Sequence, residues 1–265
     1  MSGVLLTAGY DRAWHSVYVA ESLRRLGHAP KLILVAYPMS RARIRTILRS
    51  RGWRVALAYL GRRDLAKTDS PMRAAVRALG IQKPSLRAWA RRHGVPLVLV
   101  GNLNNERAVR AAEELGPQVT AYTGGGILRS AFLRACGYRV LNCHSGPLPA
   151  VRGMNALEWS LLLGQPTGVT VHLIDEGIDT GPVLEWVEVE PVRGDTLDSL
   201  RERLVLAGAE SMVRWVLRAL DGALQTPAPP AGPRQRQCFV VAPALRELAA
   251  LRLAQRLAPA AASEE

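Results

Sequence analysis

Cysteine is scarce in this 265-residue chain, and its three thiols follow no recognisable spacing. Cys136, Cys143 and Cys238 are odd in number and lack the spacing of metal ligands. We therefore expect reduced thiols, no disulfide framework and no metal site.

The chain has no long hydrophobic run and no evident leader. No stretch approaches the roughly 18 apolar residues that a membrane span requires. Met1 to Tyr10 lacks the basic start and small-residue cleavage site of a signal peptide. Together with a hydrophobic fraction of 48%, this predicts a globular, cytoplasmic protein with no membrane partner.

Acidic residues are outnumbered by basic ones, 22 to 35, which gives a net charge of +13. Such a field attracts phosphates on RNA or on a nucleotide-linked substrate. The arginines are nevertheless scattered among alanine and leucine, without interleaved aromatic residues. We favour a solvated helical surface over a nucleic-acid site.

The first strand is not followed by a G-x-G-x-x-G loop, so dinucleotide binding is not expected. Gly3 to Gly9 suits a buried parallel strand, Ala13 to Leu26 a helix that stops at Gly27, and Lys31 to Tyr37 a second strand. This is a Rossmann-like opening.

The stretch from Leu141 to Leu184 carries the candidate chemistry. A short apolar run ends at Asn142 and His144, a helix is expected from Asn155 to Leu163, and a strand from Gly168 to Asp175 leads into a loop that holds Asp179. We interpret this as a βαβ unit, and ligands bind at the C-terminal strand edge of open α/β sheets. The three polar side chains should therefore meet over one pocket.

This trio suits acyl transfer. The carboxamide of Asn142 can donate to a developing oxyanion, and the imidazole of His144 can exchange a proton near neutral pH. The carboxylate of Asp179 can orient that imidazole or hold the attacking group. No serine or cysteine nucleophile is needed if the acceptor is itself an amine.

Four separated segments, Asn142-Cys-His144-Ser-Gly-Pro-Leu-Pro149, Arg152-Gly153, Thr167-Gly-Val-Thr-Val-His172 and Asp179-Thr-Gly-Pro182, resemble the folate-dependent formyltransferase family in order and spacing. That family formylates initiator methionyl-tRNA, glycinamide ribonucleotide and amino-sugar nucleotides. The resemblance covers about residues 118 to 222. It implies an open, mostly parallel α/β sheet with helices on both faces, and transfer of a formyl group from 10-formyltetrahydrofolate to a primary amine.

The resemblance also implies roles for individual residues. Asn142, His144 and Asp179 match the family's catalytic positions. Arg152 either anchors a phosphate or carboxylate of the substrate, or braces the turn before it. We interpret His172 as a buried hydrogen-bonded group that its strand directs away from Asp179, and Cys143 as pointing away from both catalytic candidates. The residues expected at the folate are Tyr122, Gly126, Ile127, Leu128, Asp175 and Gly177.

The remaining chain divides into a catalytic domain, residues 1–225, and a proline-rich linker with a C-terminal strand and helix, residues 226–265. The arginine-rich region 39–94 should hold three helices, which shape an acceptor pocket, pack in a homodimer or serve packing alone. Asn104 should cap a helix through Leu115, and Asp195 or Thr196 a long helix to Asp221. We expect further strands at Leu97 to Val100, Gln118 to Tyr122 and Pro182 to Glu190. Near the C-terminus we expect an edge strand at Cys238 to Val241 and a helix at Pro243 to Leu257.

Three functions remain open at this stage. The turn Ala8 to Arg12 lacks the loops common in glycinamide ribonucleotide and tRNA enzymes. The linker and the segment after it, about forty residues together, are too few for the barrel with which tRNA enzymes grip their substrate. We therefore favour a small or carrier-linked amine acceptor, such as an amino-sugar nucleotide, over an aminoacyl-tRNA. The third hypothesis is a non-catalytic descendant that binds nucleic acid or a protein through its basic first half.

Overall fold

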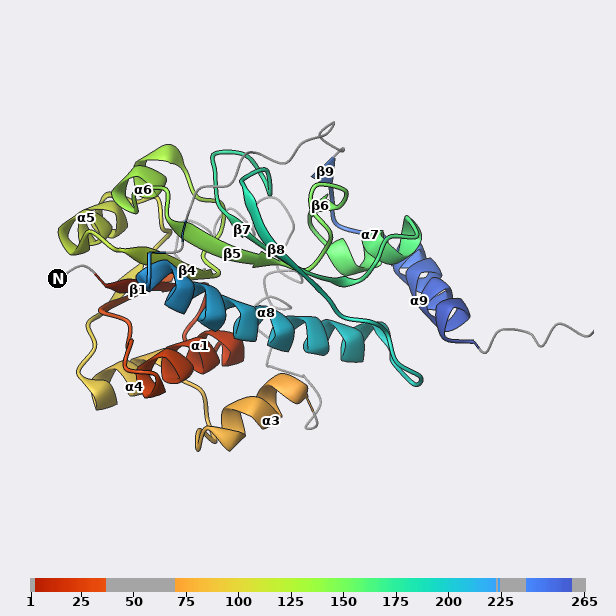
Figure 1. Ribbon diagram of the computed structural model, residues 1–265, viewed down its shortest axis with the longest axis horizontal. Helices are drawn as coiled ribbons and strands as arrows, with labels where there is room; N and C mark the ends of the chain where they lie inside the picture. The colour runs from red at the N-terminus through yellow and green to blue at the C-terminus, as the bar shows by residue number, and fades with distance from the viewer. Residues whose placement is uncertain (1–2, 37–69, 223, 225–236, 259–265) are drawn as a thin grey trace, which may run out of the picture.

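A computed structural model describes residues 3–36, 70–222, 224 and 237–258, and its centre is a seven-stranded sheet (Figure 1). The strand order is β3-β2-β1-β4-β5-β7-β8, in which the first five strands are parallel and the last two antiparallel to their neighbours. This confirms the open, mostly parallel sheet. The strands are β1 Val4–Ala8, β2 Leu32–Ala36, β3 Leu97–Val100, β4 Val119–Thr123, β5 Val140–His144, β7 Gly168–Leu173 and β8 Val183–Glu188.

Helices cover both faces of the sheet, as predicted. Side-chain caps explain several of the helix starts: Ser70, Ser85 and Thr196 each accept a hydrogen bond from the backbone N–H three residues on. The helices are α1 Trp14–Arg25, α3 Pro71–Ala78, α4 Leu86–His93, α5 Glu106–Leu115, α6 Ser130–Ala135, α7 Ala156–Leu162, α8 Leu197–Leu220 and α9 Pro243–Leu257.

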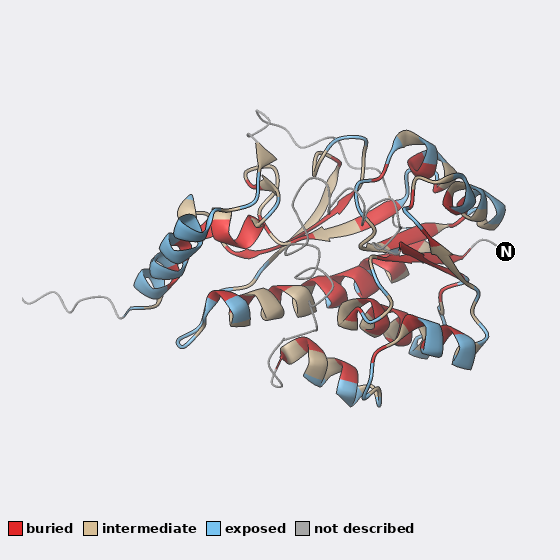
Figure 2. Cartoon of the chain, turned by 180° about the vertical axis from the view of Figure 1, so that it is seen from behind, coloured by how far each residue is buried: buried red, intermediate tan, exposed pale blue. Residues whose placement is uncertain are grey.

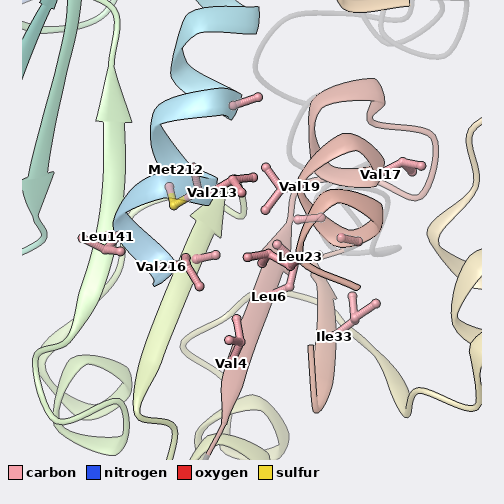
Figure 3. Packing of buried hydrophobic residues seen from close by; sticks show 14 of the residues in the cluster. Val4, Leu6, Val17, Val19, Leu23, Ile33, Leu141, Met212, Val213 and Val216 are labelled. Carbon is pink, nitrogen blue, oxygen red and sulfur yellow. The ribbon is translucent and has the colours of Figure 1, made fainter. Parts of the chain in front are cut away.

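The larger core lies between the sheet and the layer of α1, α3, α4 and α8. Leu6 of β1, Leu23 of α1 and Val216 of α8 are fully buried and converge there (Figure 3). α8 also lies over β5 and β7, where Leu141 and Val171 face it. The long helix that the sequence predicted, α8, therefore covers this core.

The opposite face is covered only in part. α5 and α6 pack through Ala108, Phe132 and their neighbours against β1 to β4 and against Val140 at the start of β5. Side chains alternate along a strand, so Asn142 and His144 point to the same face as Val140. Among the described helices, none covers that part of β5 and β7.

A third apolar cluster joins the C-terminal segment to the main body. Ala249 and Leu253 of α9 are buried against Leu157 and Leu161 of α7 and against α8, while the other side of α9 is exposed (Figure 2). The two-residue strands β6, Arg152–Gly153, and β9, Gln237–Cys238, pair in parallel beside it. The division into two domains stays a prediction.

Two local predictions were wrong in detail. Asn105, not Asn104, caps α5, because the Asn105 carboxamide oxygen receives the N–H of Ala108. β7 runs antiparallel to β5, so the expected βαβ unit is absent there. Periodicity identifies a strand but contains no information on its direction.

Part of the arginine-rich region cannot be compared with the prediction. The helix expected from Ser40 to Gly52 lies outside the described residues, whereas α3 and α4 confirm the other two. In the described ranges, no helix has both the length and the apolar character needed to span a membrane.

Candidate active site

A cavity of about 570 Å³ opens on the sheet face that α5 and α6 leave uncovered, beside β5 and β7. Its volume is within the usual range of about 300–1,000 Å³ for small-molecule sites. Among the described residues its walls are Tyr122, Gly126, Ile127, Leu128, Asn142, Cys143, His144, Ser145, Gly153, Met154, Asn155, Ala156, Leu157, His172, Ile174, Asp175, Gly177, Ile178, Asp179 and Arg201.

Asn142 is oriented by His172, its neighbour across the β5–β7 ladder. The ring Nδ1 of His172 lies 2.9 Å from the carbonyl of Leu173, which can only accept, so Nδ1 carries the proton. Nε2 then accepts from the Asn142 amide nitrogen at 2.9 Å. Burial lowers the pKa of His172 below 6.5 and keeps the ring neutral, despite the opposing effect of Asp179. One N–H of Asn142 is thereby fixed, and the other is left for a ligand in the cavity.

His144 and Asp179 form the second half of the polar centre. His144 is buried and donates from Nε2 to the carbonyl of Val151 at 2.9 Å, which leaves Nδ1 facing Asp179 Oδ2 at 3.5 Å. The other carboxylate oxygen, Oδ1, lies 3.6 Å from His172 Nε2. The Nδ1 of His144 is therefore the ring nitrogen that can take up or release a proton.

The loop that presents Asp179 is fixed at both ends. Asp179 adopts φ 51°, a left-handed conformation that a non-glycine residue seldom holds without support. Support comes from the backbone N–H of Gly153, which donates to Oδ2 at 2.9 Å. Asp175 Oδ1 accepts from the N–H of Gly177 and the hydroxyl of Thr180, which folds the loop on itself.

The segment after β4 forms the wall where the folate is expected. Its three glycines, Gly124 to Gly126, all have positive φ, and a Cβ on Gly125 would lie 2.3 Å from Leu103. The hydroxyl of Tyr122 donates to the carbonyl of Gly126 across the turn at 2.8 Å. Asn104, wrongly expected as a helix cap, donates to the carbonyl of Ile127 at 2.8 Å. The glycine triplet is thus a braced turn, and its last residue, Gly126, lines the cavity.

The nine residues expected at the catalytic centre and the folate all line this cavity. Arg152 is the exception: it is not among the described residues of the wall, and its Nη1 donates to the carbonyl of Ile178 at 3.1 Å. It braces the loop that holds Asp179. The roles assigned to these ten residues stay predictions.

Cys143 faces α8, where the Cβ position of Gly208 lies 3.4 Å from its own Cβ, so its side chain points away from the centre as expected. Burial raises the pKa of its thiol to about 12. Within the described part of the chain, no group of three His, Cys, Asp or Glu side chains is placed to hold a metal ion.

Several functional candidates escaped the sequence analysis. His172 is buried as expected, yet it faces Asp179 instead of pointing away, because β7 runs antiparallel. Gly153 was noted only as part of a motif, and its N–H proves to hold Asp179. Met154 and Asn155, between β6 and α7, and Arg201 of α8 also line the wall, although the sequence analysis assigned them no place there.

The arrangement suits transfer of an acyl group to an amine. An amide N–H that can donate to an oxyanion lies close to a histidine and a carboxylate that can exchange a proton. The apolar side chains of Leu128 and Ile174 and the backbone of 126–128 fit a flat heterocycle such as a pterin.

Comparison with known proteins agrees with this geometry. Residues 92–216 match the family described as formyl transferase. Methionyl-tRNA formyltransferase of Thermodesulfovibrio yellowstonii is 31% identical over 67% of this chain and 58% of that protein. The enzyme of the same name from Halorhodospira halophila is 36% identical over 66% of this chain and 56% of that protein. The chain spans little more than half the length of these curated relatives.

Solved structures share the fold. Glycinamide ribonucleotide transformylase 1 from Symbiobacterium toebii has a TM-score of 0.55 at 20% identity, covering 86% of this chain and 92% of that one. A sugar N-formyltransferase from a Shewanella species has a TM-score of 0.56 at 16% identity, covering 96% and 88%. The motifs, the sheet and these matches together show that the chain belongs to the formyl transferase family.

Proposed function

We propose that this protein transfers a formyl group from 10-formyltetrahydrofolate to a primary amine of a small or carrier-linked acceptor. The observation that supports this best is the convergence of Asn142, His144 and Asp179 on one wall of the cavity. The donor supplies a formyl carbon that is already activated for attack by an amine.

Each residue of the centre then has a defined task. The N–H of Asn142 that His172 does not use stabilises the negative charge on the formyl oxygen. Asp179 and the Nδ1 of His144 would take the proton that the attacking amine loses and return it to the donor nitrogen, so that tetrahydrofolate leaves as its bond to the formyl carbon breaks. The backbone of 126–128 and the loop 174–178 hold the donor and keep water from its reactive carbon.

Methionyl-tRNA is the second candidate acceptor. The curated relatives bear that name, and a net charge of +13 favours a polyanionic partner. An acceptor screen should therefore compare methionyl-tRNA with amino-sugar nucleotides at two salt concentrations. Binding to tRNA without any formyl transfer would instead favour the third hypothesis, a non-catalytic binding protein.

Asn142→Ala tests the proposed centre. Removing one oxyanion donor should lower kcat by about 10²- to 10³-fold. Calorimetric binding of 5-formyltetrahydrofolate should be retained, because the donor wall is built from other residues. Full transfer activity in this variant would contradict the assigned role, and no folate binding by the wild type at millimolar concentration would contradict the proposed donor.

A further inference from the structure

The cavity continues beyond the catalytic centre toward α7 and α8, where its wall changes character. On the β4 side the described wall includes Ile127 and Leu128, whereas on the α7 side it includes two residues with polar side chains, Arg201 and Asn155. Building on the function proposed above, we propose that this α7 side is an acceptor subsite in which Arg201 binds an anionic group, a carboxylate or a phosphate, of the amine substrate.

Arg201 is held in place by a hydrogen bond from one of its guanidinium nitrogens. Its Nη2 donates to Glu158 Oε1 at 2.5 Å, and 36% of its side chain is exposed. A guanidinium has five N–H donors in a rigid plane, and carboxylates and phosphates bind such an edge through two parallel hydrogen bonds. The donors that Glu158 does not engage are therefore positioned to bind an anion in the cavity.

Glu158 supplies the rigidity of this subsite. Its side chain is 1% exposed, and its Oε1 is also approached by the Asn155 amide at 3.4 Å and by Arg246 Nε at 3.9 Å. Within the described chain, Oε2 is buried and has no hydrogen-bond partner. A carboxylate this deeply buried is costly unless it is paired, so it stays bound to Arg201 and restricts the arginine to one orientation.

The charges around this subsite also indicate how it would select a substrate. Arg201 and Arg246 are matched by Glu158 and Asp198, which accepts from Arg246 Nη2 at 2.8 Å. Because the net charge of these four side chains is close to zero, the subsite should not attract a distant anion strongly. It should instead select an acceptor through directed hydrogen bonds once the amine is in the cavity, as a specificity determinant does.

Three amines of one framework provide the test: glucosamine, glucosamine 6-phosphate and muramic acid, which bears a carboxylate. Equilibrium titration of each into wild type and Arg201→Gln should show tighter binding of at least one anionic amine by the wild type. In the variant this preference should disappear, with an affinity loss of about 10- to 100-fold, the range for a hydrogen bond to a charged group. Arg203→Gln is the matched control, since Arg203 lies on the same helix but binds Asp195 and is absent from the described wall.

Alternative outcomes are distinct. Equal losses for neutral and anionic amines, with a lower Tm, would mean that Arg201 only joins α7 to α8. Weaker binding of 5-formyltetrahydrofolate by Arg201→Gln would mean that it binds the donor's glutamate tail. Either result overturns the subsite. Selective binding without formyl transfer would support the subsite and contradict the proposed function, so the two failures can be told apart.

Discussion

The contact between β6 and β9 makes Gly153→Ala the most informative single substitution. Gly153 adopts φ 97°, and a Cβ at this position would lie 2.2 Å from the carbonyl oxygen of Cys238. The added methyl group must displace either β9 or the backbone of Gly153. Displacement of β9 removes the strand paired with this backbone, and displacement of the backbone moves the N–H that donates to Asp179 Oδ2 at 2.9 Å.

The size of the effect follows from two terms. An alanine at positive φ costs roughly 1–2 kcal/mol of folding free energy. A hydrogen bond to a carboxylate contributes about 1.5–3 kcal/mol, so a loss of that size during catalysis lowers kcat about 10- to 100-fold. We expect a moderate fall in Tm and a much larger fall in the rate of formyl transfer.

Gly164→Ala is the matched control for this experiment. Gly164 follows α7 with φ 65°, and no atom lies within 4 Å of its Cβ position, so it shares the backbone cost without the collision. Hydrogen exchange at the Met154 amide, which donates to the Cys238 carbonyl at 3.1 Å, reports directly whether β9 stays docked. Wild-type transfer rates in Gly153→Ala, or equal losses in both variants, would refute the coupling of β9 to Asp179.

Three further results are expected. Because the pKa of His172 is lowered in the folded protein, the unfolded chain binds a proton more readily. The stability contributed by neutral His172 is complete above pH 6.5 and is lost as the pH falls below that value. His172→Gln should therefore flatten a plot of Tm against pH below pH 6.5, and an unchanged slope would contradict this explanation. Cys143, whose thiol pKa is raised to about 12, should resist iodoacetamide at pH 8 until the protein unfolds, as peptide mapping would reveal. Asn104→Ala removes the bonds to the Ile127 carbonyl and the Arg129 N–H, and should weaken 5-formyltetrahydrofolate binding severalfold with little change in kcat; a large kcat loss at saturating donor would argue against this bracing role.

Local chemistry made much of the fold predictable. Serine or threonine before an apolar period located the starts of α3, α4 and α8 to within a residue or two, at Ser70, Ser85 and Thr196, whereas α6 was not predicted. Alternation along β5 was enough to separate Asn142 and His144 from Cys143. These signals act over one turn or one strand, so a single sequence contains them in full.

What could not be predicted depends on contacts between distant segments. The sequence places Asp179 after β7, and its position beside His144 was expected from a parallel crossover that does not exist. The same side chains meet because the loop folds back over an antiparallel pair, fixed by Gly153 and Arg152. Arg201 reaches the cavity only through the packing of α8 on α7, which no local pattern encodes.

The pairing of β6 with β9 also sets an order of events during synthesis. The ribosome makes Asn142, His144, Gly153 and Asp179 well before it reaches Cys238. Until the strand at Gln237–Cys238 has emerged and paired with β6, the backbone that holds Asp179 has no neighbour on that side. The reactive centre is therefore completed late, after the sheet that supports it has had time to fold.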